Sequence, residues 1–154
     1  FVNHDHRVMF LAEKSAGVTH NHPEGIKGAQ ATAMAIFWAR RGVPRNRIRR
    51  DLESMFGYDT SVSVEELQKT YEYNETCQRT VPEAFRCFYE ATDFEDAIRN
   101  AISIGGDSDT VAAIAGSMAE AKWGVPEEIG REALARLDEG LLHTFETFIR
   151  RYLK

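Results

Sequence analysis

The sequence predicts an all-α protein, a compact multi-helix domain, on three observations. Apolar residues recur at helical spacing along most of the 154 residues, Gly and Pro separate the apolar segments, and no segment shows the alternation of a strand. With 43% hydrophobic and 28% charged residues, the composition is that of a soluble globular protein long enough to bury a core. We therefore expect a single helical domain over residues 1–154.

Four helices are expected in the first half of the chain. The first is amphipathic and ends at a glycine, the second is apolar nearly all round and rich in alanine, and the third carries a run of arginines. The second should therefore be buried in the middle of the fold. A short fourth helix begins where a serine precedes two glutamates, and an irregular connection follows it. These features lie at residues 6–16, 26–39, 45–56 and after Ser63, with Tyr71 and Tyr73 in the connection.

The second half is expected to contain five helices. One opens at Val81 with Pro82 and Glu83 in its first turn, where a missing N–H and a negative charge are tolerated. The helix after the glycine pair at 105–106 has small residues on most faces, so we expect it to pack closely beside the helix at 26–39. The other predicted starts and ends are Asp93 to Ile104, Thr110 to about Trp123, a start at Pro126, and Glu139 to Tyr152.

The composition argues against two classes of partner. A net charge of -5 disfavours general binding to nucleic acid, because phosphate recognition depends on clustered lysine and arginine. No apolar run approaches the roughly 20 residues of a membrane span, and the N-terminus lacks a signal pattern, so a cytoplasmic location is expected by default. The one basic cluster, Arg40 to Arg50, is either a solvated helix face or a patch for phosphate or a partner.

Three smaller features carry less information. Cys77 and Cys87 are too few for a secreted disulfide framework, and we expect buried free thiols. His4-Asp5 matches the metal-binding dipeptide of HD-type phosphohydrolases, but it is a lone dipeptide near the terminus. Because the sequence starts at Phe1 rather than at a methionine, we expect a fragment or a processed piece.

The stretch Gly105-Gly106-Asp107-Ser108-Asp109-Thr110 contains the clearest chemical signal. Its glycines permit a tight turn and the close approach of a ligand, and two carboxylates and a hydroxyl meet where a small-residue helix begins. Such oxygen ligands suit Mg²⁺, Ca²⁺ or Mn²⁺. Because residues two apart in a helix point about 200° apart, both aspartates can serve one ion only if the helix begins between or after them. On spacing alone, an ordinary N-cap is the more common explanation.

A second polar segment, residues 19–25, precedes the predicted buried helix. His20 and His22 have the spacing of a transition-metal pair, but no third His or Cys lies at a familiar distance. A loop that enters a helix N-terminus suits a phosphate or sugar hydroxyl, bound by backbone N–H groups and by the side chains of His20 and Asn21. Capping of the helix by Thr19, His20 and Asn21 explains the segment equally well.

Four segments share their order and spacing with a known family over nearly the whole chain. They are Thr19-His20-Asn21-His22-Pro23-Glu24-Gly25 with Gly28-Ala29, then Val81-Pro82-Glu83-Ala84, then Asp93-Phe94-Glu95-Asp96-Ala97-Ile98-Arg99, then Ile104-Gly105-Gly106-Asp107-Ser108-Asp109-Thr110. Together they closely resemble the ADP-ribosylglycohydrolases, the relatives of dinitrogenase reductase-activating glycohydrolase.

The resemblance implies an all-α fold with a two-metal magnesium or manganese centre. Such enzymes hydrolyse the N- or O-glycosidic bond that joins ADP-ribose to a protein side chain or a small molecule. The site residues that the resemblance implies are Asp107 and Asp109 as catalytic metal ligands, Thr110 as a further ligand, His20 and Asn21 against ADP-ribose, and Gly105 and Gly106 where its ribose and phosphates approach.

One half of the family pattern is absent from the chain. The family's N-terminal half carries a Thr-Asp-Asp ligand set and a Gly-rich loop for the diphosphate, and Asp59-Thr60, in reversed order and without a second Asp, is no substitute. We therefore expect the C-terminal part of a glycohydrolase, active only when joined to the missing half. The alternative is a non-catalytic helical remnant that acts as a binding or oligomerisation module. Either way, the uncovered surface predicts homo-oligomers or association with the missing N-terminal segment.

Overall fold

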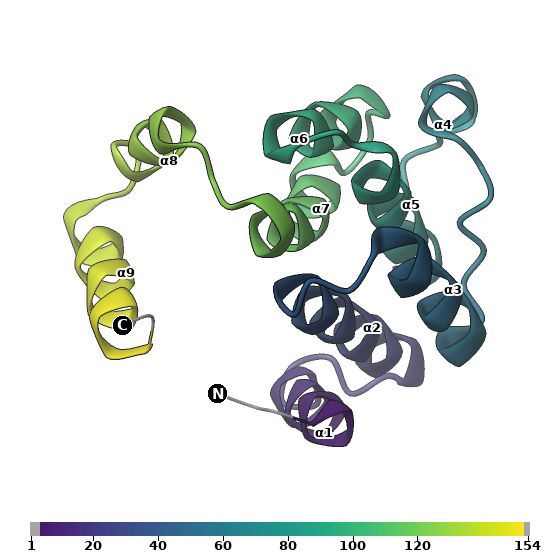
Figure 1. Ribbon diagram of the computed structural model, residues 1–154, viewed down its shortest axis with the longest axis horizontal. Helices are drawn as coiled ribbons and strands as arrows, with labels where there is room; N and C mark the ends of the chain where they lie inside the picture. The colour runs from purple at the N-terminus through teal and green to yellow at the C-terminus, as the bar shows by residue number, and fades with distance from the viewer. Residues whose placement is uncertain (1–3, 153–154) are drawn as a thin grey trace. The chain divides into compact units, whose positions relative to one another are not determined.

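The computed structural model describes residues 4–152, and all regular structure within that range is helical (Figure 1). The prediction of an all-α fold is therefore confirmed. None of these helices has the length and apolar character to span a bilayer. The helices are α1 (Asp5–Ala16), α2 (Pro23–Arg40), α3 (Arg45–Phe56), α4 (Val64–Thr70), α5 (Cys77–Glu90), α6 (Phe94–Ser103), α7 (Ser108–Trp123), α8 (Glu127–Leu134) and α9 (Glu139–Tyr152).

Contacts along the chain divide it into two units. Phe1–Gly124 contains α1 to α7, and Val125–Lys154 contains α8 and α9. The division falls between the predicted helix end near Trp123 and the predicted helix start at Pro126. A single domain over residues 1–154 remains a prediction.

Helix α2 is the centre of the first unit. It packs against α1, α3, α5 and α7 (Figure 1), and its fully buried residues are mostly small. The predictions that this helix is buried and that α7 lies beside it are both confirmed. Small residues also bring α6 and α7 together, because a Cβ on Gly116 would lie 2.8 Å from Cδ1 of Ile98.

Helix α5 supplies the largest side chains of the core. Phe85 and Phe88 are fully buried, and the Phe88 ring meets the Trp123 indole edge-on at a centroid distance of 5.6 Å. Such burial is the main term that stabilises a helical unit of this size. Other large side chains that are fully buried in this unit are Met34, Ile48, Leu52, Val111 and Met118.

Three predicted helix starts are wrong by a few residues. Helix α2 begins at Pro23, three residues before the predicted start at residue 26, so the end of the predicted loop at 19–25 is helical. Helix α5 begins at Cys77 rather than at Val81, so Pro82 lies inside the helix and not in its first turn. Helix α7 begins at Ser108, two residues before the predicted Thr110. The prediction of buried free thiols is correct for Cys87, where burial raises the thiol pKa to about 12, but wrong for Cys77, which is half-buried.

Candidate metal and ADP-ribose site

The loop before α7 presents two carboxylates at one helix end. Its glycines both adopt left-handed backbone, with φ of 81° at Gly105 and 66° at Gly106. Asp107 occupies the N-cap position, and its carbonyl accepts the first helical bond from Val111 at 3.1 Å. Its side chain, however, makes no capping hydrogen bond. The ordinary explanation of this aspartate as a side-chain cap therefore does not account for its carboxylate.

The helix begins between the two aspartates, which is the condition for both to serve one ion. Asp107 is half-buried, and Asp109 and Thr110 are exposed. The neighbouring Asp107 side chain lowers the pKa of Asp109, and the Thr110 N–H, 3.0 Å from Oδ1 of Asp109, lowers it further. Two carboxylates are thus found at one helix end, with the Thr110 hydroxyl on the next residue.

Tyr71 covers the glycine loop and was not predicted as part of the site. A Cβ placed on Gly106 would lie 2.0 Å from Cε1 of Tyr71, so the ring fills the space that a side chain would need. At Gly105 the corresponding space is open. Desolvation raises the pKa of Tyr71, and the charges of Glu83 and Asp107 raise it further, so the phenol stays neutral at neutral pH.

Tyr73, in the same connection between helices, is close enough to Asp107 and Asp109 for their charges to affect its pKa. Tyr73 donates a hydrogen bond to Glu75 at 2.6 Å, and this bond, with the charges of Glu75, Asp107 and Asp109, raises the pKa of Tyr73 to about 12. The sequence offered one signal for both tyrosines, which was the presence of two aromatic side chains in an irregular connection between helices. Aromatic residues in a loop are more often functional than aromatic residues in a core.

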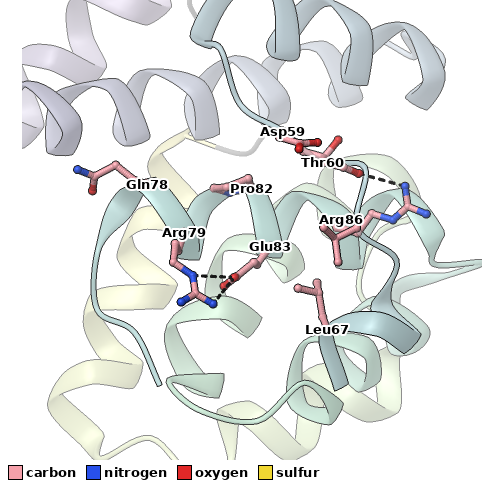
Figure 2. A pocket seen from close by; sticks show the side chains of 9 residues that line it. Asp59, Thr60, Leu67, Gln78, Arg79, Pro82, Glu83 and Arg86 are labelled. Carbon is pink, nitrogen blue, oxygen red and sulfur yellow. Dashed lines mark hydrogen bonds and ion pairs between the residues drawn. The ribbon is translucent and has the colours of Figure 1, made fainter. Parts of the chain in front are cut away.

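An ion pair on α5 lies next to the Tyr71 ring. Arg79 lies over the Tyr71 ring, 5.9 Å from its centroid, and its Nε is 3.4 Å from Oε1 of Glu83. Figure 2 shows Arg79 and Glu83 reaching toward each other along one wall of a small pocket of about 170 Å³. Burial raises the pKa of Glu83, although Arg79 opposes the change. The second Glu83 oxygen is buried without a partner in the described part of the chain.

The same pocket contains the Asp59-Thr60 pair that was rejected as a substitute ligand set. Thr60 is buried, and its hydroxyl donates to Glu53, while Asp59 accepts the Ser61 N–H at 2.8 Å. Both side chains are thus engaged in local hydrogen bonds. Their arrangement gives no reason to include them among the metal ligands.

The predicted ADP-ribose loop precedes α2. His22, not His20, caps this helix, because Nδ1 of His22 accepts the Glu24 N–H at 3.2 Å. His20 and Asn21 are exposed, and the Thr19 hydroxyl lies 2.7 Å from Nδ1 of His20. This contact orients the His20 ring and leaves its Nε2 free for a ligand. Capping therefore accounts for His22 but leaves His20 and Asn21 available.

A groove of about 550 Å³ borders both predicted parts of the site. It is lined by Thr19, directly before His20, and by Ile114, one helical turn after Thr110. Neither His20 nor Asp107 lines the groove itself. The remaining walls are apolar or small side chains of α1, α2, α5 and α7, among them Ala12, Gly28, Thr32, Ile36, Cys77 and Val81.

The described residues supply few ligands for a metal ion. Over residues 4–152, no group of three or more His, Cys, Asp and Glu side chains lies close enough to hold a metal ion. This also applies to His4-Asp5, where the exposed His4 instead occupies the N-cap position of α1. Asp107, Asp109 and the Thr110 hydroxyl supply oxygen donors suited in kind to Mg²⁺ or Mn²⁺, but too few to complete an octahedral shell.

Comparisons with known proteins identify the family. The chain is 30% identical over 131 residues to an uncharacterized protein of Archaeoglobus fulgidus, and the match covers 75% of this chain and 43% of that protein. The chain thus spans less than half the length of this relative. No solved structure matches the chain significantly. The family model described as ADP-ribosylglycohydrolase matches residues 1–153, and the chain belongs to this family.

Proposed function

We propose that the chain supplies part of a metal-dependent site that hydrolyses the glycosidic bond between ADP-ribose and a protein side chain or small molecule. Family membership supports the reaction class in general. The observation that carries the specific assignment is the Asp107 carboxylate, which lies at the start of α7 without a capping bond and two residues before the exposed Asp109. Carboxylate oxygens at one helix end are the kind of donor that a hard cation prefers.

Asp107, Asp109 and Thr110 would hold Mg²⁺ or Mn²⁺ in this proposal. A bound cation of this kind supplies Lewis acidity, polarising the scissile bond and lowering the pKa of a water molecule. Because three donors leave an octahedral shell incomplete, the other ligands come from water, the substrate, or a part of the protein outside these residues. The resemblance implies a Thr-Asp-Asp set for that purpose.

The chain's other site residues would position the substrate. The exposed His20 ring, oriented by Thr19, offers Nε2 to a ribose hydroxyl or phosphate, and Asn21 adds an amide beside it. Gly105 has open space above its Cα, which lets a sugar or phosphate approach the backbone. At Gly106 that space is filled by Tyr71, so a ligand that approaches there meets the phenol ring.

The second candidate function is a non-catalytic helical module that binds or oligomerises. It is favoured by the lack of any group of three or more metal-binding side chains within residues 4–152. A remnant of this kind would keep the helical core of the family and lose the chemistry.

Calorimetry separates the two functions. Mg²⁺ and Mn²⁺ are titrated into the chain and into a double variant with Asp107→Asn and Asp109→Asn, and ADP-ribose is then titrated with and without metal. Asp51→Asn is the matched control, because this aspartate lies on α3, its side chain is 42% exposed, and its ion pair within residues 4–152 is with Arg47. Metal binding that survives in the control and disappears in the double variant supports the site. Absence of both metal and ADP-ribose binding contradicts it.

An assay of ADP-ribose release from ADP-ribosylated arginine tests catalysis. Turnover by the chain alone excludes the remnant. Turnover that appears only when the chain is joined to the rest of a longer protein supports a shared metal site. If the joined protein binds metal and substrate but the Asp107→Asn and Asp109→Asn changes leave turnover intact, the proposed ligand roles are wrong.

A further inference from the structure

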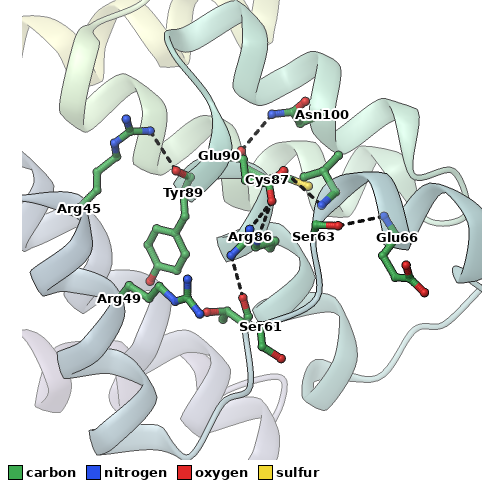
Figure 3. A network of polar contacts seen from close by, with 12 residues as sticks. Arg45, Arg49, Ser61, Ser63, Glu66, Arg86, Cys87, Tyr89, Glu90 and Asn100 are labelled. Atoms are coloured by element: carbon green, nitrogen blue, oxygen red, sulfur yellow. Dashed lines mark hydrogen bonds and ion pairs between the residues drawn. The ribbon is translucent and has the colours of Figure 1, made fainter.

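A second polar pocket lies between α3 and α5, away from the glycine loop. It has a volume of about 430 Å³, and its walls are rich in guanidinium groups (Figure 3). In Figure 3 the Tyr89 ring stands between Arg45 and Arg49, with its hydroxyl at the Arg49 end. The lining residues are Arg45, Asn46, Arg49, Arg86, Tyr89 and Glu90.

The carboxylate in this pocket is already paired. One Glu90 oxygen accepts from Nε of Arg86 at 2.7 Å, and the other accepts the Val64 N–H at 3.2 Å. Arg86 also donates to the Thr60 carbonyl at 3.2 Å. Arg86 and Glu90 therefore neutralise each other, and neither has much capacity left for a ligand.

Arg45 and Arg49 keep free donors. Arg45 uses only Nη1, which donates to the carbonyls of Phe88 and Tyr89 at 3.2 Å each and to that of Ala91. Arg49 uses only Nε, 2.8 Å from Oε1 of Glu53. Within residues 4–152, Arg45 takes part in no ion pair. Each guanidinium thus keeps two nitrogen donors, and the charge of Arg45 has no counter-ion in this part of the chain.

The start of α3 increases the positive potential. Its first turn contains no acidic residue, and its N-cap, Pro44, provides no side-chain acceptor. The partial positive charge of a helix N-terminus normally favours acidic side chains there, so arginine at this position is electrostatically unfavourable unless an anion is nearby. In a protein with a net charge of -5, Arg45 is thus a positive charge without a counter-ion within residues 4–152, at a helix end that is itself positive.

Both free guanidinium groups are held in place. Arg45 is fixed by the carbonyls at the end of α5 and stacks on the Trp123 ring at 5.0 Å, and Arg49 is fixed by Glu53. A ligand would therefore lose little of its binding energy to ordering these side chains. Planar forks of N–H donors match the oxygen geometry of phosphate and carboxylate groups.

We propose that this pocket binds a phosphate group, either free phosphate or the phosphate of a small monoester. The residues that carry the proposal lie outside the glycine loop and the His20 loop, so it stands or falls independently of the glycohydrolase function. It also resolves the two explanations of the arginine-rich helix, since Arg45 and Arg49 face the pocket while Arg50 is exposed and does not line it.

Titration followed by NMR at low ionic strength tests the pocket. Inorganic phosphate, phenyl phosphate and acetate are added separately, and shifts of the Arg45 and Asn46 amides are followed to saturation. The Arg45 and Asn46 amides report on this pocket, whereas phosphate bound at the His20 loop or the glycine loop would shift amides there instead. Saturable shifts with both phosphates indicate that a monoester is accepted, and saturation with inorganic phosphate alone indicates free phosphate. Added salt should weaken binding, because the pocket is open to solvent.

Matched variants locate the binding. Arg49→Gln should weaken phosphate binding about tenfold, the effect of one charge-assisted hydrogen bond. Arg50→Gln makes the same charge change on the same helix and should leave it unaltered. Arg49→Lys retains a cation and should bind phosphate with intermediate affinity. Because a lysine can still pair with Glu53, this variant controls for a loss of stability in Arg49→Gln.

Three outcomes would overturn the proposal. These are the lack of saturable phosphate binding, equal weakening by Arg49→Gln and Arg50→Gln, and acetate binding as tight as phosphate. Without saturable binding there is no phosphate site. Equal weakening by the two variants would mean that phosphate is attracted by general positive charge. Acetate binding as tight as phosphate would mean that the pocket prefers carboxylates.

Discussion

At the scale of single residues, Gly106 is the position where the backbone and a neighbouring ring both exclude a side chain. Gly106→Ala would force alanine into left-handed backbone and bring its Cβ to 2.0 Å from Tyr71. We expect it to lose about 1–2 kcal/mol from backbone strain and a further ~1–3 kcal/mol from displacing the ring. Urea denaturation measures the change in the free energy of unfolding.

Gly105→Ala is the control for this prediction. Its φ of 81° gives similar strain, but nothing lies within 4 Å of the added Cβ. Only the strain term should remain, and combining Gly106→Ala with Tyr71→Ala should recover most of the difference between the two glycines. Equal losses at both glycines would show that Tyr71 does not pack on the loop.

Glu53 should make stability depend on pH. Burial alone would raise its pKa, but hydrogen bonds from Thr60 and Arg49 outweigh burial and hold the pKa below its usual 4.5. A lowered pKa in the folded state means that the ionised form stabilises the fold above pH 4.5, and that this stability is lost as the pH falls through the folded pKa. Glu53→Gln should therefore lose about 1 kcal/mol at pH 7 and almost nothing near pH 3.

Urea denaturation at a series of pH values measures this dependence. Glu65→Gln is the comparison, since Glu65 forms a highly exposed pair with Lys69 that should contribute little at any pH. A loss on Glu53→Gln that stays the same from pH 7 to pH 3 would mean that ionisation of Glu53 does not stabilise the fold.

The residue types of the candidate site were largely visible in the sequence, and their hydrogen bonds were not. Two glycines followed by spaced aspartates predicted an oxygen-rich turn at a helix start, because glycine permits the turn and carboxylates supply the oxygens. Whether Asp107 capped its helix could not be predicted, since capping depends on a rotamer and not on residue type. Tyr71 was missed because its contact with Gly106 joins residues far apart in the chain.

At the scale of helices, α6 begins with a cap that the sequence did indicate. Oδ1 of Asp93 accepts the Asp96 N–H at 2.9 Å, and the Asp96 side chain in turn accepts the Thr92 N–H at 2.8 Å. Asp93→Ala should lose about 1 kcal/mol, whereas Asp93→Asn keeps an acceptor and should lose only a few tenths. Thermal unfolding followed by circular dichroism compares them. Equal losses would show that charge, rather than the capping bond, stabilises this end.

The start of helix α5 could not be predicted from the sequence. Its first turn, Cys77 to Thr80, lacks an apolar pattern, while Val81-Pro82-Glu83 has the composition of a helix start. The helix nevertheless extends over Pro82, which gives up one backbone hydrogen bond to the carbonyl of Gln78. Packing of the residues after Pro82 against α2 and α7 outweighs that local preference, and tertiary packing cannot be read from local sequence.

At the scale of the whole molecule, the second unit presents an apolar stripe. Along α9, Leu141, Phe145, Phe148 and Tyr152 recur at helical spacing and are each between 42% and 56% exposed. Apolar side chains in one row along a helix are usually covered by a partner. We therefore expect the chain to self-associate through this stripe, or to bind the remainder of a longer protein with it.

Sedimentation velocity over a range of concentrations tests self-association. Phe148→Ser should weaken self-association about tenfold, because one aromatic ring fewer is buried against the partner. Phe10→Ser is the matched control. Phe10 lies on α1 in the other unit and is 54% exposed, so this substitution makes the same chemical change outside the stripe. A chain that stays monomeric throughout contradicts self-association through the stripe. Equal effects of the two serine variants would mean that exposed apolar area in general, and not the α9 stripe, drives association.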